Sequence, residues 1–128
     1  MNVAVRFIAV AILLGSALDL AAEDVIRLAP LANNRGAAVL RAEIIDYTGR
    51  EIRARLPSGK ELTYPSERVL DFQTEYSPRH LAADKLFDAR RYAAALGEYQ
   101  LAAREEERTW VRRMLLARRI WCHQYLKQ

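Results

Sequence analysis

The chain has 128 residues, with 20 basic and 16 acidic side chains, a formal net charge of +4 and a hydrophobic content of 52%. This length admits one compact unit or two small units that share a core, and it excludes a third domain. The single cysteine, Cys122, excludes an intramolecular disulfide. Its place on an apolar helical stripe predicts a buried structural thiol, and an intermolecular bridge is the alternative.

The first 22 residues have the form of a secretory signal peptide. Arg6 gives a basic start, an apolar run of about 12 residues extends to Leu18, and small residues precede Glu23. The apolar run is shorter than the roughly 20 residues that a membrane-spanning helix needs. We therefore expect an exported protein, periplasmic or extracellular, that is cleaved after Ala22 or, as a second choice, after Ala17. An N-terminal segment that is not cleaved and anchors the protein is the alternative.

Residues 23–76 contain short apolar or alternating segments, separated by turn-forming residues at intervals of about 8 to 15 residues. This spacing is typical of an antiparallel β-meander that curls into a small barrel. Hairpin turns are expected at Gly49 and Gly59, because glycine adopts the positive φ that tight strand connections require. The expected strands cover 25–28, 38–47, 51–56, 61–64 and 69–74.

The order of these segments resembles the five-stranded small barrels of the SH3-like and Sm-like type. The segment from Tyr64 to Arg68 takes the place of the tight link before the last strand, and the resemblance covers about 50 residues. It implies a small closed β-barrel. Because barrels of this kind have many unrelated activities, it implies no function.

From Ser77 onward glycine nearly disappears and helix-forming residues dominate. Ser77 followed by Pro78 is a helix start signal, a cap residue with proline at the first helical position. An apolar period of 3.6 residues then predicts helices over 79–89, 92–104 and 107–126. We therefore expect an α+β chain with a signal peptide at 1–22, a β-barrel-like domain at 23–76 and a helical domain at 77–128.

The segment from Ala83 to Ala102 resembles one tetratricopeptide (TPR) motif, a pair of antiparallel helices, and the third helix is placed like the start of an incomplete second repeat. Arg79 and Glu107 differ from the tryptophan and proline that the family favours there, which leaves the angle to the third helix open. Arrays of such repeats need about three repeats to bury a continuous core. The helices must therefore be covered by the β domain, by a second copy or by another protein. The residues that the resemblance places between the helices of the hairpin are Ala83, Leu86, Tyr92, Ala95, Tyr99 and Ala102.

Charge differs between the two halves of the chain. Residues 23–78 carry eight basic and nine acidic side chains, whereas 79–128 carry eleven basic and six acidic ones. A solvated helix face is the simpler interpretation of these arginines. The functional interpretation is a surface for an acidic protein, phospholipid head groups or an anionic polysaccharide, which suit an exported protein better than nucleic acid does. The candidate interaction surface consists of Arg108, Arg112 and Arg119.

Trp110 and Trp121 are three helical turns apart. This spacing predicts two core residues on one helix face rather than stacking platforms for nucleic acid.

The inventory of titratable residues argues against catalysis. His80 and His123 are the only histidines, and Cys122 and His123 are helix neighbours whose side chains diverge by about 100°. The sequence shows no spacing typical of a metal site or a phosphate-binding loop. We therefore expect a non-catalytic protein-interaction module without cofactor or metal, which binds another protein or itself. Binding of an anionic surface, including peripheral contact with a membrane, is the alternative, and an accessory subunit of an enzyme is the least favoured one.

Overall fold

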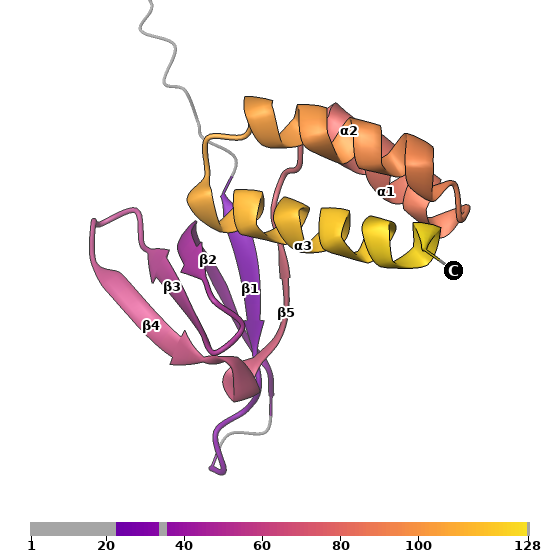
Figure 1. Cartoon of the computed structure of the whole chain (residues 1–128). Coiled ribbons are helices and arrows are strands. Elements are labelled where there is room, and N and C mark those ends of the chain that lie inside the picture. The colour runs from indigo at the N-terminus through magenta and orange to yellow at the C-terminus, as the bar shows by residue number, and fades with distance from the viewer. Residues whose placement is uncertain (1–22, 34–35, 128) are drawn as a thin grey trace, which may run out of the picture.

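The computed structural model describes residues 23–33 and 36–127, which form a five-stranded sheet followed by three helices (Figure 1). The expected α+β class and the expected order of elements are confirmed. The predicted signal peptide at 1–22 lies outside the described residues. The elements are β1 (Asp24–Leu28), β2 (Ala38–Tyr47), β3 (Glu51–Arg55), β4 (Glu61–Pro65), the 3₁₀ turn η1 (Ser66–Arg68), β5 (Val69–Gln73), α1 (Pro78–Asp88), α2 (Tyr92–Glu105) and α3 (Thr109–Leu126).

The sheet is antiparallel and has the strand order β4, β3, β2, β1, β5. The long strand β2 lies at its centre, because its first half pairs with β1 and its second half pairs with β3. Gly49 and Gly59 adopt φ values of 83° and 89° in the turns of the two hairpins. The prediction of tight turns at these glycines is confirmed.

The predicted closure of the strands into a barrel is wrong, because the sheet is open and β4 and β5 are its two edges. Figure 1 shows η1 leading from one edge to the other at the end of the sheet away from the helices. The physical reason lies in how the apolar face of the sheet is covered. A barrel buries that face against itself, whereas here α3 covers part of it, with Trp110 packed edge-on against Phe72 of β5.

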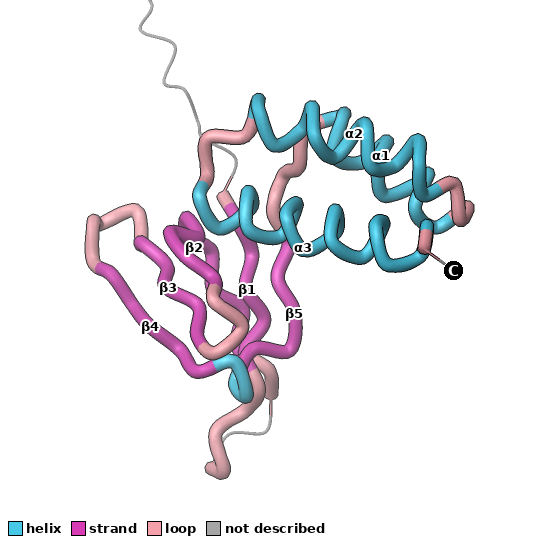
Figure 2. The backbone as a smooth tube through the Cα atoms, viewed as in Figure 1, coloured by secondary structure: helices cyan, strands magenta, loops and turns pink. Residues whose placement is uncertain are grey.

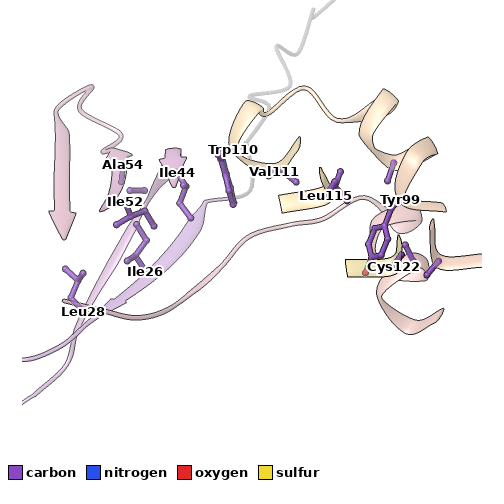
Figure 3. Close-up of a cluster of buried hydrophobic side chains, with 14 residues drawn as sticks. Ile26, Leu28, Ile44, Ile52, Ala54, Tyr99, Trp110, Val111, Leu115 and Cys122 are labelled. Atoms are coloured by element: carbon purple, nitrogen blue, oxygen red, sulfur yellow. The ribbon is translucent and has the colours of Figure 1, made fainter. Parts of the chain in front are cut away.

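The buried residues of the sheet and of the helices form one continuous core (Figure 3). The sheet contributes alternate residues of its strands, as Ile52 and Ala54 of β3 illustrate, because successive side chains of a strand point to opposite faces. Trp110 and Val111 of α3 connect this set to the buried residues of α1 and α2. The segments 23–76 and 77–128 therefore share a core.

The helices pack as an antiparallel series at one end of the sheet (Figure 2). Helix α1 starts as expected, since the Ser77 side chain accepts a hydrogen bond of 3.2 Å from the backbone N–H of His80 and Pro78 follows the cap. A tight turn connects α1 to α2, and Arg90 in this turn has a positive φ of 60°. Helix α3 packs against α2 and also contacts β2. None of the helices in the described part of the chain is long and apolar enough to cross a membrane.

Candidate interaction surface

The six residues that the TPR resemblance places in the hairpin lie where the helices meet. Ala83, Ala95, Tyr99 and Ala102 are fully buried, and Leu86 and Tyr92 are partly buried against the same core. Alanine at these positions lets the helix backbones approach closely. The hydroxyl of Tyr99 donates a hydrogen bond of 2.5 Å to Asp84 of α1. Burial and this bond raise the pKa of Tyr99, so the phenol stays protonated and links α1 to α2.

Stacked aromatic rings join the three helices near the C-terminal end of α3. Figure 1 shows that the sheet does not reach this end. Tyr92, the first residue of α2, stacks on Tyr125 near the end of α3, with ring centroids 4.6 Å apart and ring planes at 13°. Trp121 stacks on the same Tyr125 ring at 6.2 Å, and Phe87 of α1 lies edge-on to Tyr92 at 5.3 Å. Aromatic pairs of this geometry are favourable beyond the area that they bury. They fix the C-terminal half of α3 on the hairpin.

Helix α3 is apolar on two sides. The buried residues Val111, Leu115 and Cys122 line its inner side, and Trp110 is buried where the helix packs on the sheet. On the side turned to solvent, Leu116, Ile120 and Trp121 are each 51% exposed, and Ala117 is exposed beside them. We call Leu116, Ala117, Ile120 and Trp121 the outer stripe. A typical surface helix has one apolar side and one polar side, so α3 presents an apolar surface that the described elements leave uncovered.

Two of the four arginines of α3 are used inside the molecule. Arg113 forms an ion pair with Asp46 of β2 and also donates a hydrogen bond to the carbonyl oxygen of Tyr47. The guanidinium of Arg118 lies 5.1 Å from the centre of the Phe87 ring in α1, a cation–π contact. These two side chains attach α3 to the sheet and to the hairpin.

The other two arginines, Arg112 and Arg119, lie two helical turns apart along one border of the outer stripe. Arg112 is exposed and donates a hydrogen bond to the backbone carbonyl of Glu106. Arg119 is half-buried, and its Nε is shielded from solvent and has no hydrogen-bond partner among the described residues. Within the same residues neither arginine forms an ion pair with a carboxylate. Since α3 contains no aspartate or glutamate, this border carries uncompensated positive charge.

Arg108 does not belong to this surface, contrary to the expectation from the sequence. Its guanidinium donates hydrogen bonds to both carboxylate oxygens of Glu106, to the hydroxyl of Thr74 at 2.8 Å and to the carbonyl oxygen of Glu75 at 2.8 Å. The hydrogen bonds between Arg108 and Glu106 lower the pKa of Glu106 and raise the pKa of Arg108. Arg108 therefore links the turn between α2 and α3 to the segment after β5.

A groove of about 720 Å³ lies between this cross-link and the sheet. Its buried carboxylates are fully used within the molecule. Asp24 accepts hydrogen bonds from the backbone N–H of Ile44 at 2.8 Å and from the hydroxyl of Thr74 at 2.6 Å, and Glu106 is held by Arg108. The buried polar groups of this groove thus hold the sheet and the helices together.

The cysteine and the two histidines, which are the residues considered for catalysis, differ in their exposure to solvent. Cys122 is fully buried, as predicted, and burial raises the pKa of its thiol, which disfavours the reactive thiolate. His80 is buried, and burial lowers its pKa, whereas His123 is exposed. In the described ranges, no three His, Cys, Asp or Glu side chains are grouped so that they could hold a metal ion.

Comparison of the chain with protein-family models, with curated proteins and with solved structures gives no match.

The outer stripe is the feature that the sequence reasoning missed. Trp121 was expected in the core together with Trp110, but it is 51% exposed whereas Trp110 is 1% exposed. The reason is that only the first half of α3 lies over the sheet (Figure 1). The signal was present as two apolar pairs four residues apart, Leu116 with Ile120 and Ala117 with Trp121.

Proposed function

We propose that this chain is a non-catalytic protein-interaction module that binds a partner protein through the outer stripe of α3. The observation that supports this proposal is that three large apolar side chains are half exposed on a helix whose other side already lies in the core. Fully burying a large apolar side chain contributes about 1.5–3 kcal/mol. Covering the outer stripe therefore supplies several kcal/mol to a complex. The TPR-like hairpin of α1 and α2 is the rigid support of this surface, and export through residues 1–22 is part of the proposal.

The alternative is binding of an anionic surface through the arginines alone. The specific observation in its favour is that Arg112 and Arg119 have no carboxylate partner among the described residues. Arg108, however, is held in an internal cross-link, so Arg112 and Arg119 are the members of the candidate surface that remain. We favour a protein partner because apolar residues, not arginines, dominate the exposed part of α3.

A photo-activated cross-linking amino acid at position 120, incorporated in the producing cells, tests the proposal. We expect one discrete adduct with another protein, and we expect Leu116→Asp in the same chain to remove it, because a charge in the stripe opposes burial. The matched control has the cross-linker at Thr63, an exposed residue of β4 on a different part of the surface. An adduct at both positions, or one that Leu116→Asp leaves unchanged, would contradict the proposal. Circular dichroism of each variant verifies that the fold is kept.

A further inference from the structure

The outer stripe has the shape that a second helix needs. Its four residues follow the spacing i, i+1, i+4, i+5, which forms two adjacent columns along one side of α3. The stripe from Leu116 to Trp121 is roughly 9 Å long at 1.5 Å per residue. Side chains of a neighbouring helix pack into the groove between such columns. The geometry therefore favours an occupant that lies along α3.

The charge beside the outer stripe indicates which kind of helix binds there. Arg112 and Arg119 border the stripe two turns apart, so a helix lying along α3 meets both if its acidic residues are also spaced by about seven positions. Neither arginine forms an ion pair with a carboxylate of the described residues, so a partner carboxylate at either guanidinium makes a favourable charge-assisted hydrogen bond. We infer that the partner of α3 is an amphipathic helix with an apolar face for the outer stripe and acidic residues for Arg112 and Arg119. This inference depends on the proposed function.

A second copy of the chain fits this surface less well. Pairing two outer stripes places the positive borders of both copies at one interface, and α3 offers no carboxylate to compensate them. Like charges in contact oppose association and favour a partner of opposite charge.

A lipid bilayer also fits less well than a helix. Helices that bind in the membrane surface bury an apolar face by about 5–10 Å along their length. The outer stripe covers only about one and a half turns of α3, and Arg113 beside it is attached to β2.

The experiment uses the full chain, a synthetic 18-residue acidic amphipathic peptide of leucine and glutamate, and a control peptide in which lysine replaces every glutamate. Trp121 is the reporter, since it is half exposed whereas Trp110 is buried. We expect a blue shift of the tryptophan emission with the glutamate peptide only, absent in Trp121→Phe. Because charge attraction between the arginines and the glutamates contributes to binding, the affinity falls as salt is raised.

Variants separate the contributions to binding. Arg112→Gln together with Arg119→Gln is expected to weaken peptide binding about three- to tenfold, the effect of two exposed ion pairs. Leu116→Ser together with Ile120→Ser is expected to abolish it. Arg104→Gln, an exposed arginine of α2, is the matched control and leaves the affinity unchanged.

Four results would overturn the inference: equal binding of both peptides, no binding of the glutamate peptide, insensitivity to the arginine variants, or a Trp121 response only to vesicles of phosphatidylglycerol. A concentration-dependent dimer that the glutamate peptide does not disturb would also overturn it, in favour of a second copy. The cross-linking experiment distinguishes this failure from failure of the proposed function. A specific adduct at position 120 without peptide binding would retain a protein partner but reject an acidic helix.

Discussion

His80 is a buried neutral side chain among charged ones. It is 3% exposed, and the ring of Tyr76 covers it at a centroid distance of 4.4 Å. Its Nδ1 has no hydrogen-bond partner among the described residues, and its Nε2 lies 3.6 Å from the carboxylate of Asp84. Burial lowers the pKa of His80 more than nearby carboxylates raise it. The charged groups that act on it are Asp84, Glu106, Arg108 and Arg118.

The stability of the protein should therefore depend on pH through His80. The pKa in the folded state lies below the unfolded value of about 6.5, so the unfolded chain binds more protons at acidic pH. The contribution of neutral His80 to stability is fully present above a pH of about 6.5, and it decreases as the pH falls toward the folded-state pKa. We expect the free energy of unfolding, measured with urea, to decrease from about pH 7.5 to about pH 5.5, and to decrease less in His80→Gln. Equal decreases in both proteins would refute this assignment.

The carboxylate of Glu106, whose pKa is lowered from 4.5, loses its contribution to stability only at lower pH, as the pH falls through its folded-state pKa.

Asp24 is the second residue with a testable structural role. Its carboxylate accepts the backbone N–H of Ile44 in the strand beside it and the hydroxyl of Thr74 after β5. Asp24→Ala leaves the N–H of Ile44 buried without an acceptor, and we expect a loss of about 2 kcal/mol or more in the free energy of unfolding. The exposed Glu67 provides the control, since Glu67→Ala should stay within about 0.5 kcal/mol of the wild type. Urea unfolding at neutral pH measures both, and equal effects would contradict the role of Asp24.

At the scale of elements, the two halves of α3 have different tasks, because the first half covers the sheet and the second half projects beyond it. Trp110→Ala is expected to cost about 3–5 kcal/mol of stability, the range for deleting a large buried aromatic side chain. Trp121→Ala is expected to cost about 1 kcal/mol or less, because this side chain is half exposed. Thermal or urea unfolding of the two variants checks the contrast. A Trp121 variant as unstable as the Trp110 variant would mean that Trp121 contributes to the core as Trp110 does.

The elements themselves were predictable because their signals are local. Gly49 and Gly59 mark the hairpin turns, and Ser77 with Pro78 marks the start of α1, each through the conformation of a few neighbouring residues. Closure of the sheet was not predictable in this way, because tertiary packing decides whether the edge strands β4 and β5 pair with each other or another element covers the apolar face. The role of Arg108 was hidden for the same reason, since its partner Thr74 is 34 positions away.

At the scale of the whole molecule, the shared core predicts one unfolding transition. Trp110 contacts Phe72 of the sheet while its helix packs on α2, so loss of either layer exposes apolar surface of the other. We expect tryptophan emission, which reports on α3, and far-ultraviolet circular dichroism, which reports on all elements, to give coincident urea curves. Two separated transitions would show that the sheet and the helices are stable independently.

The open sheet also has a consequence for the behaviour of many molecules in one solution. Its edge strands expose backbone groups to which a strand of a neighbouring molecule can add, which is the first step of aggregation. Pro65 ends β4 and has no N–H to offer, and the ion pair of Asp71 with Arg27 places charged side chains on β5 and its neighbour. Both edges are only five residues long. These features discourage the growth of intermolecular sheets. The open edges of the sheet therefore carry their own protection against aggregation.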